Sequence, residues 1–177
     1  IINYTSGTTG FSKGVMIPYR AIWSNLDFAY QVLSPLKMGD STISILPMAH
    51  MYGMAFEFIF EFCRGCHIFF LTRVPSPQII AQAFSDIKPA LIIAVPLVIE
   101  KIIRKRVFPL VQTHKMKILM NMPVISKKVK EKICEQVKNA FGGNFYEIIV
   151  GGAPLNQEVE TFLYNIGFVS TSLYIFI

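Results

Sequence analysis

Residues 89–106 read PALIIAVPLVIEKIIRKR and contain the two patterns that decide the fold. Pro89–Val95 is an uninterrupted apolar run, which is typical of a strand buried on both faces of a sheet. Four apolar residues then recur at helical spacing up to Arg106, namely Val98, Ile99, Ile102 and Ile103. A buried strand that leads into an amphipathic helix is the repeating unit of a parallel α/β sheet.

The same alternation extends over the rest of the chain. We expect further strands at Ile1–Tyr4, Ser41–Leu46, Cys66–Leu71 and Asn144–Val150. We expect further helices at Tyr19–Leu33, Met51–Arg64, Pro77–Ile87, from Ser126 onward and at Asn156–Ile166. Ser76, Ser126 and Asn156 are the expected N-cap residues, and Phe108–Pro123 is the least regular region. The sequence therefore predicts an α/β fold with a mostly parallel sheet and helices on both of its faces.

The composition is apolar for a domain of this length. Of 177 residues, 53% are hydrophobic and 16% are charged, and the mean hydropathy is +0.47. The longest apolar runs fall short of the ~18 residues of a membrane span, because Glu57, Glu61 and Pro96 interrupt them. The first residues do not resemble a signal peptide, and three cysteines are few enough to suggest a reduced, cytoplasmic protein.

The apolar composition and a start inside an expected strand predict that residues 1–177 form one partial domain of a larger protein. Surface that other parts would cover is then exposed in this chain, which predicts self-association.

The positive charge is concentrated in one segment. The net charge is +6, and Lys101–Lys138 contains eleven of the seventeen Lys and Arg residues but only two of the eleven acids. A basic helix face is most often simply solvated, but it can also contact the inner face of an anionic membrane. Nucleic acid is a less favoured partner, since no aromatic residues interleave with the basic ones.

Residues 5–14 read TSGTTGFSKG and lie between an expected strand and an expected helix. Glycine allows the backbone to approach a ligand closely, and successive backbone N–H groups and hydroxyls can surround phosphate oxygens. Lys13 would add a positive charge to such a site. The stretch is not a Walker A loop, because Gly14 follows the lysine where Ser or Thr would be required. A plain surface loop is the alternative.

Two further stretches also follow expected strands. Residues 46–53 read LPMAHMYG, in which His50, taken alone, is more often a packing or capping residue than a catalytic one. Residues 150–156 read VGGAPLN, which is typical of a strand-to-helix turn with Asn156 as the N-cap. Since ligands of open α/β sheets gather at the carboxyl ends of the strands, we expect all three stretches to converge there.

The segment Tyr4–Val15, YTSGTTGFSKGV, resembles the phosphate-binding signature of the adenylate-forming superfamily of acyl-CoA synthetases, luciferases and adenylation domains. The order and spacing of the three stretches fit this family over most of the chain, and among its branches the sequence most resembles bacterial long-chain fatty acid–CoA ligases. That resemblance implies a reaction in which ATP, with Mg²⁺, converts a fatty acid to an acyl-adenylate and pyrophosphate. The acyl group then passes to CoA.

The resemblance also implies roles for individual residues. The ATP phosphates would be bound by Thr5, Ser6, Gly7, Thr8, Thr9, Gly10 and Lys13. The acyl and adenylate pocket would be lined by His50, Tyr52 and Gly53, and the adenine would stack against Gly151, Gly152, Ala153 and Pro154. Ser12 is a mild departure, because many members have proline there.

The resemblance ends near residue 166. The family continues with Gly-Tyr-Gly-x-Thr-Glu, whereas Tyr174 here lies between Leu173 and Ile175 and no acid follows. The glutamate that holds Mg²⁺, the ribose-binding aspartate and the catalytic lysine of the C-terminal domain have no counterpart in the 177 residues. We therefore expect the central part of an N-terminal domain, with no metal site of its own and no activity alone.

Other readings stay open. A non-catalytic remnant that binds a nucleotide or acyl-adenylate and a basic membrane-surface module are the two alternatives to a ligase fragment. Cys63–His67 matches the haem-attachment pattern, but we expect Gly65 to separate a helix from a strand between the two cysteines. A zinc site would need two more ligands, and Cys134 is the only other cysteine.

Overall fold

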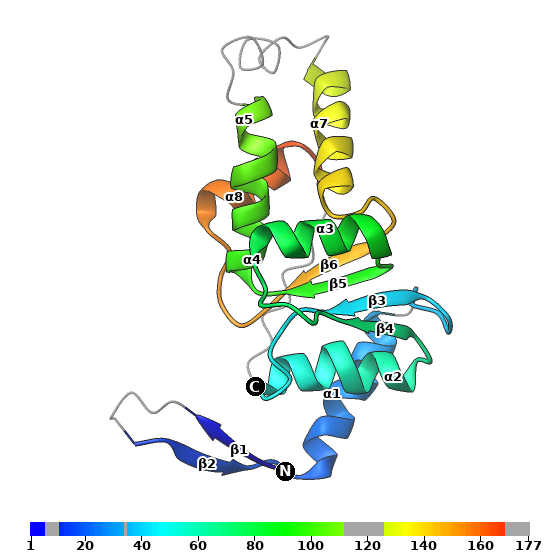
Figure 1. Cartoon of the computed structure of the whole chain (residues 1–177), viewed down its shortest axis with the longest axis vertical. Coiled ribbons are helices and arrows are strands. Elements are labelled where there is room, and N and C mark those ends of the chain that lie inside the picture. Colours follow the sequence, from blue (N-terminus) through cyan, green and yellow to red (C-terminus); the bar gives the residue numbers. More distant parts are fainter. Residues whose placement is uncertain (6–10, 34, 112–125, 169–177) are drawn as a thin grey trace.

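The computed structural model describes residues 1–5, 11–33, 35–111 and 126–168. A four-stranded sheet in the order β4-β3-β5-β6 forms its centre (Figure 1). The strands are His67–Phe70 (β4), Ser41–Ser44 (β3), Leu91–Ala94 (β5) and Glu147–Val150 (β6). All neighbouring strands are parallel, and each lies inside a range predicted from the sequence. The predicted parallel sheet is confirmed.

Helices cover both faces of this sheet, as predicted (Figure 1). One face packs against α1 (Tyr19–Val32), the π-helix η1 (Gly53–Phe60) and α2 (Glu61–Cys63). The other face packs against α3 (Pro77–Ile87), α4 (Pro96–Ile102), the π-helix η2 (Ile103–Val107), α5 (Phe108–Val111), α7 (Ser126–Ala140) and α8 (Gln157–Asn165).

Alternate residues of the central strands serve the two cores. In β5, Leu91 and Ile93 pack toward α1 and η1, whereas Ile92 and Ala94 pack toward the opposite set of helices. Since successive side chains of a strand point to opposite faces, a strand with both faces covered must be apolar at every position. This requirement explains the uninterrupted apolar run in β5, whose four residues are all buried.

Local signals define several helix ends. The Ser76 hydroxyl oxygen accepts a hydrogen bond from the Ile79 backbone N–H at 3.3 Å and caps α3, as predicted. The chain leaves α3 at Lys88, which has a φ of 50°. Asn156 caps α8 in the same way, because its side-chain oxygen accepts from the Glu158 N–H at 3.1 Å.

The prediction that Phe108–Pro123 is irregular is wrong for its first four residues. The helical segment that starts with α4 continues through η2 and α5 to Val111. Val107, Phe108 and Val111 extend the apolar stripe and are buried against the core, so the helix gains by continuing past Arg106. The remainder of that region lies outside the described residues.

The first strand does not belong to the parallel sheet. β1 (Ile2–Thr5) pairs antiparallel with β2 (Lys13–Met16), with Ile2 opposite Met16 and Thr5 opposite Lys13. Figure 1 shows this hairpin at the end of the molecule opposite α5 and α7. β2 is not predicted from the sequence, because a four-residue strand between a glycine-rich stretch and Pro18 is too short to show a period.

The described helices contain no segment of sufficient length and apolarity for a membrane crossing.

Candidate functional site

A cavity of about 420 Å³ lies where the chain leaves the carboxyl ends of β3, β5 and β6. Three segments surround it, one following each strand. The lining residues are Leu46, Pro47, His50, Tyr52 and Gly53 after β3, Val95, Pro96, Leu97 and Glu100 after β5, and Gly152 and Ala153 after β6. This is the position at which open parallel sheets bind their ligands.

The structure brings together two of the three stretches that the sequence singled out. His50, Tyr52 and Gly53 line the cavity from one side, and Gly152 and Ala153 line it from another. Pro154 is exposed and is not among the lining residues.

Gly151 lies directly behind the cavity wall. A Cβ atom at this position would come within 2.6 Å of Tyr52 Cζ and 2.7 Å of the Tyr52 hydroxyl oxygen. Real Cβ contacts are never so short, so only glycine lets the chain after β6 approach the Tyr52 ring this closely. Gly151 therefore lets the two stretches come into contact, and its predicted contact with adenine stays a prediction.

The third stretch is placed differently from the prediction. Thr5 and Lys13 face each other across the β1–β2 hairpin, and Lys13 is exposed. Ser6, Gly7, Thr8, Thr9 and Gly10 lie outside the described residues. β1 is not a strand of the parallel sheet, so the strand-end argument does not apply to this stretch, and its place beside the cavity stays a prediction.

Tyr52 brings a hydrogen-bond donor to the cavity wall. Its hydroxyl group is buried and has no hydrogen-bond partner among the described residues. Burial, and secondarily the nearby Glu57 carboxylate, raise the pKa of Tyr52 well above its ordinary value, so the phenol stays protonated. A buried, protonated hydroxyl is suited to donate to an acceptor atom of a ligand.

In the sequence, Glu57 is visible only as a charged residue that interrupts an apolar run. It is fully buried in η1, and its Oε2 accepts hydrogen bonds from the Ser44 hydroxyl at 3.1 Å and from the N–H groups of Ile45 at 3.1 Å and Leu46 at 2.8 Å. Burial raises the pKa of Glu57 to about 7, and these three hydrogen bonds oppose that shift. The carboxyl group thus ties the helix that follows Tyr52 to the chain that leaves β3.

Glu61 lies one helical turn further along and is also buried. Its Oε2 accepts a hydrogen bond from the Thr42 hydroxyl at 2.7 Å. Burial raises the pKa of Glu61 to about 9, and the Glu57 carboxylate contributes to the same shift. The signal that could have revealed both residues is the pair of acids four positions apart inside an otherwise apolar helix, which requires polar partners in the core.

The described residues contain no group of three or more His, Cys, Asp or Glu side chains that could hold a metal ion. Cys63 ends α2 and Cys66 precedes β4, with Gly65 between them at a φ of 73°, which is the placement expected from the sequence.

Comparisons with known proteins agree with this architecture. The family model described as AMP-binding enzyme matches residues 1–174. The long-chain-fatty-acid–CoA ligase 5 of Mus musculus is 30% identical over 178 residues, an alignment that covers 92% of this chain and 26% of the mouse protein. The chain therefore spans about a quarter of the length of such curated relatives.

Two solved structures share the fold. The adenylation domain of a carboxylate reductase from Mycobacterium chelonae superposes with a TM-score of 0.66 at 23% identity, over 96% of this chain and 25% of that one. The O-succinylbenzoate coenzyme A synthetase of Bacillus subtilis, solved with ATP and magnesium ion, gives a TM-score of 0.64 at 17% identity, over 94% and 28% of the two chains.

Proposed function

Because the chain belongs to the AMP-binding enzyme family, we propose that it is the central part of the AMP-binding domain of a long-chain fatty acid–CoA ligase. The intact ligase would join a fatty acid and ATP to give acyl-adenylate and pyrophosphate, and then transfer the acyl group to CoA. The observation that carries the proposal is the cavity at the strand ends, where the segments after β3 and β6 meet.

In this proposal, different segments of the chain would contact different parts of the acyl-adenylate. The backbone of Gly151–Pro154 would lie against adenine, and the exposed His50 and the Tyr52 hydroxyl would lie beside the acyl group. The phosphates would be bound by Thr5–Gly10 and by Lys13 in the hairpin.

The adenylation step needs more than these contacts. It depends on stabilising charge on the phosphates and on holding the attacking carboxylate in line. The residues after Ile166 do not reproduce the Gly-Tyr-Gly-x-Thr-Glu motif, whose glutamate would help to hold Mg²⁺ in the intact enzyme. We therefore expect the 177-residue chain alone to bind nucleotide without forming acyl-adenylate, with Mg²⁺ and CoA handled by the whole enzyme.

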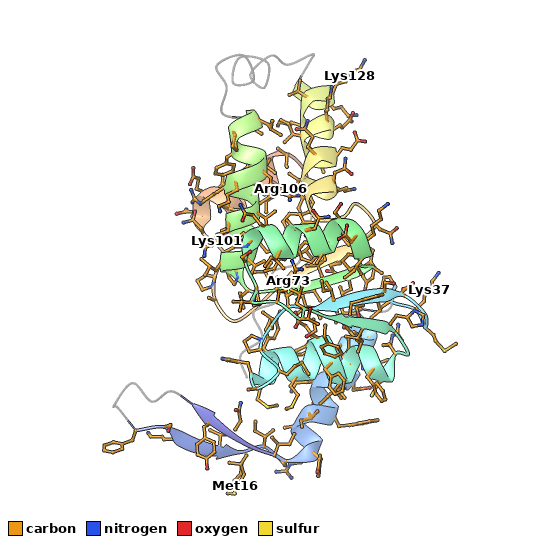
Figure 2. All side chains as sticks on the ribbon, viewed as in Figure 1. Met16, Lys37, Arg73, Lys101, Arg106 and Lys128 are labelled. Carbon is orange, nitrogen blue, oxygen red and sulfur yellow. The ribbon has the colours of Figure 1, made fainter. Side chains whose placement is uncertain are left out.

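Lys13→Ala is expected to weaken ATP binding about tenfold or more, because a charge-assisted contact with phosphate contributes roughly 1.5–3 kcal/mol. Calorimetric titration of the chain with ATP, with and without Mg²⁺, measures this loss. Lys37→Ala is the matched control, since Lys37 is also exposed and lies away from the hairpin (Figure 2). Equal ATP affinities of the two variants would show that Lys13 does not contact the phosphates. Tight binding without Mg²⁺ would favour a non-catalytic nucleotide-binding remnant.

A second candidate role is contact with an anionic membrane surface. α7 packs beside η2, and most basic residues of α4, η2 and α7 are exposed; Figure 2 labels Lys101, Arg106 and Lys128, one from each of these elements. The exposed basic residues are Lys101, Arg104, Lys105, Arg106, Lys127, Lys128, Lys132 and Lys138. Each basic residue near such a surface contributes about 1 kcal/mol at low salt. We propose a cytoplasmic protein that touches the inner face of the membrane through this surface, without nucleic acid as a partner.

The double variant Lys105→Glu/Arg106→Glu is expected to lose at least tenfold in affinity for phosphatidylserine-containing vesicles, because it reverses two charges on this surface. Vesicle co-sedimentation at low and high salt measures the effect. Lys37→Glu serves as the control for a charge reversal elsewhere. Binding that is equal on purely zwitterionic vesicles, or that does not fall with salt, would dismiss the membrane role.

Exposed apolar side chains also lead us to propose self-association of the isolated chain. Met16 in β2, Tyr19 and Trp23 in α1 are 83%, 81% and 71% exposed. Apolar residues gathered on two adjacent elements favour contact with another surface.

A further inference from the structure

The loop between β6 and α8, residues 151–155, forms one wall of the cavity and is tied at both ends to the same neighbouring segment. At its start, the Gly151 N–H donates to the Ala94 carbonyl oxygen at 3.1 Å, at the end of β5. At its end, the Asn156 N–H donates to Glu100 Oε1 at 2.8 Å, in α4. The position of the wall therefore depends on β5 and α4, which are more than fifty residues earlier in the chain.

The second tie is reinforced one helical turn further along. Arg104 Nη2 donates to the side-chain oxygen of Asn156 at 3.1 Å and forms an ion pair with Glu158 at 2.8 Å. The same Asn156 oxygen accepts the Glu158 N–H as the cap of α8. Asn156 is thus held through its backbone by Glu100 and through its side chain by Arg104.

We propose that Glu100 is a positioning residue of the cavity, which holds the loop 151–155 in the place that a bound nucleotide requires. Glu100 lines the same cavity as Gly152 and Ala153, and its carboxylate contacts the end of their loop at Asn156. Gly151 is held against the Tyr52 ring, whereas Gly152 has a φ of 85° and no side chain to pack, so this part of the loop depends on the contact at Asn156. A hydrogen bond to a carboxylate is stronger than one between neutral groups, which makes the Glu100 contact the effective tie.

The Arg104–Glu158 ion pair is expected to hold the end of the loop less strongly than the Glu100 hydrogen bond does. Its side chains are 43% and 56% exposed, and an ion pair in water contributes only about 0–1 kcal/mol. Loss of Glu158 should therefore leave the loop in place, whereas loss of Glu100 should release it. The expected effect of Glu100 on nucleotide binding rests on the proposed function, whereas its expected effect on the position of the loop does not.

Glu100→Ala is expected to speed hydrogen exchange of the Asn156 amide about tenfold, while amides of β5 and β6 keep their protection and show that the fold is intact. The ATP dissociation constant is expected to rise by about the same factor. Glu100→Gln, whose side-chain oxygen can still accept the Asn156 N–H but without the charge, should restore part of both losses. Glu158→Gln is the matched control and should change either quantity less than about twofold.

The outcomes separate the inference from the proposed function. Unchanged exchange at Asn156 in Glu100→Ala, or no rescue by Gln, would overturn the positioning role. Faster exchange with an unchanged ATP dissociation constant would overturn it as well, since the loop position would not matter to the ligand. If the unaltered chain binds no ATP but Glu100→Ala still frees the Asn156 amide, the tie is supported and the nucleotide assignment fails.

Discussion

Glu57→Ala is expected to lower the free energy of unfolding by at least about 3 kcal/mol. The substitution removes the shared acceptor of the Ser44 hydroxyl and of the Ile45 and Leu46 N–H groups. Each buried donor left without a partner costs about 1–3 kcal/mol, and the space left by the side chain adds to the loss. Urea denaturation followed by circular dichroism measures the change.

The control for this prediction is Glu131→Ala, because Glu131 is exposed on α7 and its removal should change stability by less than about 0.5 kcal/mol. The loss in free energy of unfolding for Glu57→Gln should lie between those of the two alanine variants, since the Gln side-chain oxygen can keep part of the hydrogen bonding to β3. If Glu57→Ala stays within about 1 kcal/mol of the unaltered chain, the carboxyl group does not hold the end of β3 as the hydrogen bonds imply.

Stability is expected to fall as the pH rises from about 5 to about 9. The pKa values of Glu57 and Glu61 in the folded chain are raised to about 7 and about 9, mainly by burial. Above the ordinary pKa the unfolded chain has lost these protons while the folded chain still holds them, so raising the pH favours unfolding. The loss continues through the folded pKa of each group and then stops. Its total is on the order of several kcal/mol, at about 1.4 kcal/mol for each unit of pKa.

The groups around the two acids allow a specific test of this dependence of the free energy of unfolding on pH. Glu61 faces the Thr42 hydroxyl and Glu57, and Glu57 faces Ser44 and Tyr52. Glu61→Gln keeps an oxygen for the Thr42 hydrogen bond but cannot ionise, so it should flatten the slope above about pH 7 and raise stability near pH 9. Urea denaturation at several pH values measures both effects. A slope that persists unchanged in Glu61→Gln, or stability that rises with pH, would contradict the assignment.

The strands, helices and N-caps that could be predicted from the sequence are those whose pattern lies within a few neighbouring residues. The apolar run of β5 and the helical spacing of Ile99, Ile102 and Ile103 indicate burial directly, because a side chain's face is set by its position along its own strand or helix. The caps at Ser76 and Asn156 were likewise predictable, since each acts on an N–H within three residues. β2 was missed because four residues carry too little pattern.

The sequence by itself determined that this chain forms a parallel α/β sheet covered on both faces, and its motifs indicated two of the segments that surround the cavity. Only the tertiary structure decided which polar groups meet. Glu57 reaches Leu46 across eleven positions, and Glu100 reaches Asn156 across fifty-six. Such contacts follow from the strand order β4-β3-β5-β6, which places segments distant in the chain side by side. Hydrophobic periodicity is a property of one element, whereas a hydrogen bond between elements depends on how both of them pack.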